Sequence, residues 1–140
     1  INGILKPSEL EALADQQLKL LILGFKRLRR GEAWYQAEKE DIVRKQEWLK
    51  EHIKEYLSRF QVVSFDNLAI EQLEVRQLLG KEEWEEFYAG DDGTHTFYID
   101  MVERKFAASS TVEQEKRYAL LDSVDEMFRR VNNDVNTRRN

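Results

Sequence analysis

The sequence predicts an all-α fold, a single-domain bundle of five or six helices over residues 1–140. Strong helix formers (Leu, Glu, Lys, Arg and Gln) dominate a chain that has one proline and six glycines. Apolar residues recur at steps of three and four over several long stretches. Residues that favour strands are scattered rather than grouped. We therefore expect long amphipathic helices that share one core.

Composition narrows the class of protein further. With 41% hydrophobic and 35% charged residues, the chain is too apolar to stay disordered and too charged for a bilayer. Its longest apolar run, Leu20–Leu23, is far shorter than the about 20 residues of a membrane span. There is no visible signal peptide, and the chain has no cysteine. We expect a cytoplasmic protein that makes no membrane contact and holds no disulfide or thiolate metal site.

The first half of the chain predicts a long antiparallel, coiled-coil-like hairpin of two helices. Residues 1–7 form a lead-in, and the capping box Ser8–Glu11 starts a helix that runs to about Arg30. Gly31 is a typical residue for a helix end. One continuous helix of about 50 residues through Gly31 stays open, because a glycine inside a helix costs only about 1 kcal/mol.

The second helix of this hairpin is expected from about residue 32 to residue 60. Four residues at seven-residue spacing indicate a narrow apolar stripe that faces one partner helix: Tyr35, Ile42, Leu49 and Tyr56. Residues 61–65 are the best strand candidate in the chain, but we interpret them as a connector.

Shorter elements follow in the second half. Ser64 or Asp66 is expected to cap a third helix that ends before Gly80. A short acidic helix follows over residues 81–89, and residues 90–95 form a loop. Residues 97–107 are interpreted as a helix, although the alternation of Phe97, Ile99 and Met101 would also suit a strand. A final helix is expected over residues 111–133, before a frayed tail at 133–140.

An acidic cluster in the short helix suggests one possible chemistry. Glu82, Glu83 and Glu86 resemble the first half of the acidic motif of the all-helical MazG-type nucleotide pyrophosphatases. The resemblance implies that carboxylates from two helices hold Mg²⁺ against a triphosphate. Asp100 and Glu103 would supply the second pair, with the two acid types exchanged relative to the family pattern. The competing interpretation is a solvated face of an ordinary helix.

Two basic clusters suggest a different contact. One comprises Lys26, Arg27, Arg29 and Arg30, and the other Arg129 and Arg130. Side by side, they would form a cationic edge for a phosphate backbone or an acidic partner. Each cluster also lies where cations stabilise a helix C-terminus. The net charge of −5 argues against nucleic acid as the main partner.

Large aromatic residues give the last indication of function. Trp34 and Trp48 lie on one side of the second helix, and with Trp84 and Tyr88 they either pack additional helices or form a docking surface. No complete catalytic, cofactor or metal motif stands in the chain. The sequence therefore favours a non-catalytic helical interaction module, an adaptor or a subunit of a larger assembly, bound to another protein or to itself. A nucleic-acid-associated subunit and a Mg²⁺-dependent pyrophosphatase are the alternatives.

Overall fold

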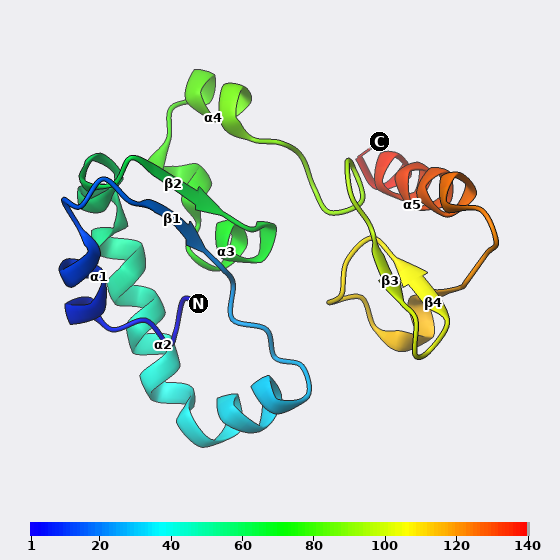
Figure 1. Cartoon of the computed structure of the whole chain (residues 1–140), viewed down its shortest axis with the longest axis horizontal. Coiled ribbons are helices and arrows are strands. Elements are labelled where there is room, and N and C mark those ends of the chain that lie inside the picture. The colour runs from blue at the N-terminus through cyan, green and yellow to red at the C-terminus, as the bar shows by residue number, and fades with distance from the viewer. Residues whose placement is uncertain (140) are drawn as a thin grey trace. The chain divides into compact units, whose positions relative to one another are not determined.

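The computed structural model describes residues 1–139, and the chain divides into two compact units, Ile1–Phe87 and Tyr88–Asn140 (Figure 1). Each unit has its own apolar cluster. The first is centred on side chains such as Leu10, Ile53 and Leu73, and the second on Phe106, Met127 and Val131. The expectation of a single domain over 1–140 stays a prediction.

The first unit alternates helices with two short strands. Its elements are α1 (Pro7–Leu13), β1 (Lys19–Ile22), α2 (Arg30–Tyr56), the 3₁₀ helix η1 (Leu57–Arg59), β2 (Val62–Phe65), α3 (Asn67–Gln72), the 3₁₀ helix η2 (Val75–Leu78) and α4 (Lys81–Phe87). The strands β1 and β2 pair in parallel, with Leu20 opposite Val63 and Ile22 opposite Phe65. The long helix α2 connects them, so the unit is built on a β–α–β crossover.

One face of this parallel pair closes the core. Leu20, Ile22, Val63 and Phe65 belong to the same apolar cluster as Leu49 and Ile53 of α2. The stripe predicted for the second helix is therefore confirmed in part, since Ile42, Leu49 and Tyr56 are buried. Leu49 and Tyr56 pack on α1, α3 and the strands rather than on an antiparallel helix.

The second unit is a three-stranded antiparallel meander with one helix. Its elements are β3 (Tyr98–Asp100), β4 (Lys105–Ala107), the 3₁₀ helix η3 (Gln114–Lys116), β5 (Tyr118–Ala119) and α5 (Val124–Arg139). Phe106 pairs with Ile99 on one side and with Tyr118 on the other. Its fully buried ring packs with Met127 and Val131 of α5, which close one face of the sheet.

The all-α prediction is wrong, because the described residues contain two small sheets and form a mixed α/β fold rather than a helical bundle. The predicted coiled-coil-like hairpin fails at its first helix. Only Pro7–Leu13 is helical, and the apolar run after it forms β1. A short apolar run has no periodicity that separates a buried helix from a strand, and its partner strand β2 lies far along the chain.

Several boundaries in the rest of the chain also change. Gly31 lies in the first turn of α2 and neither turns a hairpin nor interrupts one continuous helix. Residues 61–65 contain a strand rather than a connector, and Asp66 caps α3 as expected by accepting the Ala69 N–H. The helix expected over 97–107 is the hairpin β3–β4, so the strand alternative was correct there.

The last predicted helix begins later than expected. Residues 111–123 form a loop, η3 and β5, and the helix α5 runs from Val124 to Arg139. Arg117 and Tyr118 are held by tertiary contacts that outweigh local helix propensity. Residue 140 of the predicted tail lies outside the described residues. Within the described part of the chain, no helix combines the length and the apolar character needed to cross a membrane.

Candidate functional site

The acidic candidates for Mg²⁺ lie on two elements of different kinds. Glu83 and Glu86 are exposed on α4, and the Glu83 carboxylate accepts the Gly80 N–H at 2.9 Å at the start of that helix. Asp100 ends β3, and Glu103 lies in the turn that follows. The second helix that the pyrophosphatase pattern requires is therefore a hairpin. Among the described residues, no three acidic, His or Cys side chains are grouped to hold a metal ion.

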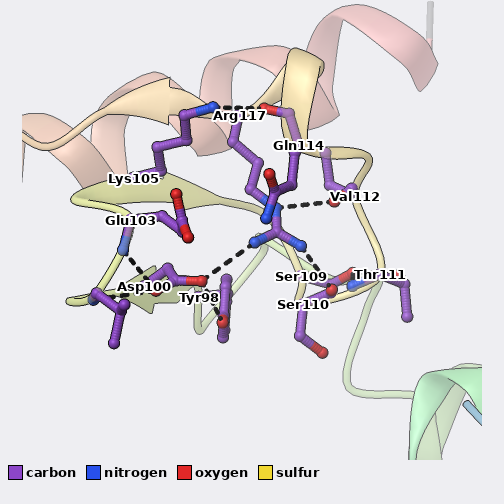
Figure 2. A network of polar contacts seen from close by, with 11 residues as sticks. Tyr98, Asp100, Glu103, Lys105, Ser109, Ser110, Thr111, Val112, Gln114 and Arg117 are labelled. Atoms are coloured by element: carbon purple, nitrogen blue, oxygen red, sulfur yellow. Dashed lines mark hydrogen bonds and ion pairs between the residues drawn. The ribbon is translucent and has the colours of Figure 1, made fainter. Parts of the chain in front are cut away.

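Asp100 instead organises the turn between β3 and β4 (Figure 2). Its buried carboxylate accepts the backbone N–H groups of Val102 at 3.1 Å and Glu103 at 3.0 Å, and the Tyr98 hydroxyl at 3.1 Å. The Arg117 guanidinium lies 3.4 Å from the same carboxylate. The Glu103 N–H is the largest of the contacts that hold the pKa of Asp100 below its usual range, and the Arg117 charge adds to them. Asp100 therefore stays ionised, and its carboxylate is occupied by these contacts within the chain.

Arg117 ties the loop before β5 to this hairpin. Its side chain is 8% exposed, and its remaining N–H groups donate to the carbonyl oxygens of Val112 at 2.8 Å and Ser110 at 3.0 Å. Lys105 of β4 donates to the Gln114 carbonyl beside it (Figure 2). These contacts hold the β3–β4 turn and the loop before β5 in place. We therefore assign the network a structural role.

The basic candidates are distributed over both units. Lys26, Arg27 and Arg29 lie in the segment between β1 and α2, and Arg30 is the first residue of α2. Arg27 forms a bidentate contact with Glu32 at 3.1 Å and lies over the Tyr35 ring. Arg129 and Arg130 lie on α5 of the second unit, where the Arg130 guanidinium stacks on Tyr118. Most of these cations, Lys26 included, thus have an interaction within the chain, and Arg129 donates to the Asp125 carbonyl at 3.4 Å.

The aromatic candidates do not share one environment. Trp48 is half-buried against the core, stacked on His52 with ring centroids 4.7 Å apart. Trp34, on the same helix, is exposed, while Trp84 of α4 is half-buried beneath the Arg76 guanidinium. Tyr88 donates to the Asp91 carboxylate. Of the four, only Trp34 is open to solvent as an anchor residue.

Amide side chains, of which Asn2 is fully buried, lie at the carboxyl ends of β1 and β2, where α/β folds commonly bind ligands. The Asn2 side chain is fully buried, donates to Gln72 at 2.9 Å, and accepts from Phe25 N–H and Gln46. Gln72 in turn donates to the Phe25 carbonyl at 2.9 Å. Because these groups satisfy one another, this end of the sheet is closed by the chain itself.

The outer edge of β1 is the most distinctive open feature of the first unit. In a parallel ladder, alternate residues of a strand bond to the same neighbour. The Asp66 N–H donates to the Ile22 carbonyl, which places the backbone groups of Leu20 and Ile22 toward β2. Those of Lys19 and Leu21 therefore face the other edge. No hydrogen bond to them is found within residues 1–139, and no further strand joins this sheet there (Figure 1).

The open edge is short and bounded at both ends. At its carboxyl end, the Leu23 carbonyl accepts the Asn2 N–H at 2.9 Å. Before its amino end, Gln17 has a positive φ of 56°, which breaks the extended conformation. The accessible edge is therefore Lys19–Leu21, with an N–H and a carbonyl available at each of its two end residues.

Apolar side chains also project from the sheet face that points away from the core. Leu21 is 59% exposed, Val62 is 44% exposed and Leu23 is 39% exposed. Parallel strands are normally covered on both faces. Apolar residues at successive positions of Leu20–Leu23 are typical of such a strand, and this was the sequence signal that would have identified the open face.

Comparison with known proteins does not indicate a family, a function or a related fold for the chain. No protein family matches the chain, and neither a curated protein nor a solved structure resembles it significantly.

Proposed function

We propose that the chain is a protein–protein interaction module, an adaptor or a subunit of a larger assembly, and that it binds through the outer edge of β1. The observation that carries this proposal is the set of unpaired backbone groups at Lys19 and Leu21, next to an exposed apolar face. An unpaired edge strand is a template for a strand supplied by another chain.

The edge has two of the features that usually prevent such pairing, since β1 is only four residues long and carries Lys19, but it has neither a proline nor a bulge. Natural sheets protect their edges with proline, bulges, charged side chains or a covering helix. Lys19 is the one charged residue of β1, and the register with β2 is continuous from Lys19 to Ile22. A two-stranded sheet is also only marginally stable by itself, so a third strand would stabilise the unit.

The expected affinity follows from the small size of the edge. Each added backbone hydrogen bond contributes about 0.5–1.5 kcal/mol, and burial of Leu21 adds at most about 1.5–3 kcal/mol. Association costs at least about 4 kcal/mol. A strand on this edge therefore gives weak binding by itself, and a tight complex requires that the partner also covers Leu21, Leu23 and Val62.

A proline at the edge tests the proposal. Leu21→Pro removes an outward N–H without touching the ladder to β2, because edge strands tolerate proline on their solvent side. Leu28→Pro is the matched control, since Leu28 is an exposed leucine in the segment between β1 and α2. Both variants are checked for folding by circular dichroism and used as bait in extracts of the source cell.

The expected result is that a protein, either a foreign partner or a second copy of this chain added with a different tag, is retained by the unmodified chain and by Leu28→Pro but lost with Leu21→Pro. Equal retention by the two proline variants would contradict the use of the β1 edge. The absence of any specifically retained protein would count against an interaction module.

A further inference from the structure

The open edge of β1 is self-complementary in its backbone groups. Lys19 and Leu21 are two residues apart, and both present an N–H and a carbonyl to the same side. In an antiparallel pair, two opposite residues exchange both of their hydrogen bonds in every second pair. If a two-fold axis lies midway between the Leu20 residues of the two copies, Lys19 of one copy lies opposite Leu21 of the other. The N–H and carbonyl groups of Lys19 and Leu21 in each copy are then all hydrogen-bonded, and neither strand extends past the open edge of the other.

The side chains favour the same register. Lys19 would lie opposite Leu21 of the second copy, so the two ammonium groups are not opposed. The aliphatic part of Lys19 would cover Leu21, which is 59% exposed in the single chain. A longer foreign strand would gain no more backbone hydrogen bonds, because Gln17 and the Asn2–Leu23 contact limit the edge.

We infer that the occupant of this edge is a second copy of the chain, paired antiparallel through β1 with its two-fold axis at Leu20. This inference rests on the proposed function and specifies its partner. The joined sheet would have four strands, β2–β1–β1–β2. Both copies would use the same edge, Lys19–Leu21, as an isologous interface requires. The outer face of the joined sheet would carry Leu21, Leu23 and Val62 from both copies.

The expected dimer is weak and concentration-dependent. Stable interfaces bury about 1,200–2,000 Å² in total, and pairing over Lys19–Leu21 is short of this. We expect a dissociation constant on the order of 100 µM. Sedimentation equilibrium from about 10 µM to about 1 mM should show the mass rise from 16.7 kDa toward twice that value. Leu28→Pro should behave in the same way, and Leu21→Pro should shift the transition at least about tenfold higher in concentration.

The register is tested by disulfide trapping, because the chain has no cysteine of its own. In the inferred pairing, Leu20 faces its own copy in a non-hydrogen-bonded pair, where Cα atoms are about 4.5 Å apart and a disulfide fits. The two Leu21 residues are diagonal neighbours at about 7–8 Å, beyond the range of a disulfide. Leu20→Cys should therefore oxidise to a covalent dimer well ahead of Leu21→Cys.

Three results would overturn the inference: a mass of 16.7 kDa that stays constant to about 1 mM, dimerisation of Leu21→Pro equal to that of the unmodified chain, or faster trapping of Leu21→Cys. A failure of this kind is distinguishable from a failure of the proposed function. If only the inference fails, Leu21→Pro would still lose a foreign protein in the retention experiment, whether the chain is monomeric or dimerises in another way.

Discussion

Replacement of Gly24 by alanine tests the packing that holds β1 in place. Gly24 follows β1, and a Cβ atom at this position would lie 2.4 Å from Leu68 Cγ, 2.6 Å from Leu68 Cβ and 2.8 Å from the Ala69 nitrogen. Ordinary contact begins at 3.4 Å, so α3 would have to move by about 1 Å. That movement also strains Asp66, whose carboxylate accepts the N–H groups of Gly24 and Ala69, both at 2.8 Å.

The cost follows from these two effects. Overpacking of a core typically costs about 1–3 kcal/mol, and loss of a helix N-cap adds about 1 kcal/mol. We therefore expect Gly24→Ala to lower the free energy of unfolding by about 3 kcal/mol in urea denaturation followed by tryptophan fluorescence. Gly80→Ala is the control, because its Cβ would meet only Glu83 Oε2 at 3.5 Å. A loss below about 1 kcal/mol in Gly24→Ala would refute the close approach of β1 and α3.

Three further predictions concern the core, the acid range and the second unit. Ile53→Ala should cost about 2–5 kcal/mol in the same assay, because Ile53 is fully buried, whereas Leu21→Ala should stay within about 0.5 kcal/mol; equal costs would contradict the assignment of core and surface. Hydrogen bonds from Arg59 and then Tyr56 lower the pKa of Glu11 to about 2 from 4.5, so its stabilising contribution is present above pH 4.5 and disappears as the pH falls toward 2. Thermal unfolding from pH 5 to pH 2 should accordingly show a shallower decline in Glu11→Gln, and an unchanged decline would remove Glu11 as a cause. Arg117→Met should speed amide exchange over residues 109–117, and unaltered exchange there would show that Arg117 does not hold the loop.

The sequence was most informative where the apolar pattern was long and periodic. The heptad spacing of Ile42, Leu49 and Tyr56 located the buried side of α2 correctly, since a regular stripe over many residues has no good alternative to a helix. The capping role of Asp66 was also predictable, because it depends on local backbone geometry.

The errors lie where tertiary contacts outweigh local preference. The run Leu20–Leu23 contains good helix formers, yet its backbone pairs with Val62–Phe65 in the crossover that α2 makes possible. Ser110–Glu113 has a capping-box pattern that predicts a helix start, yet Arg117 and Tyr118 are held by contacts to Asp100 and Phe106. Propensity is a weak prior in such segments.

The candidate site was missed for the same reason. An open strand edge exists only after the strands have been paired correctly, and an all-helical interpretation contains no strand edge. The predicted aromatic anchors depended on the helical arrangement, and Trp48 packs in the core instead. The acidic pair Asp100 and Glu103 was predicted to lie on a helix, whereas the Asp100 carboxylate accepts backbone N–H groups of the hairpin turn.

Amide hydrogen exchange in dilute solution tests most directly whether the edge of β1 is open. At about 10 µM, below the expected dissociation constant, the amides of Leu20 and Ile22 should be protected by the ladder to β2, while those of Lys19 and Leu21 exchange near the rate of an unstructured chain. At concentrations where a second copy occupies the edge, the amides of Lys19 and Leu21 should become protected as well. Protection of the Leu21 amide comparable to that of Ile22 in the dilute protein would contradict the account, because the edge would then already be occupied.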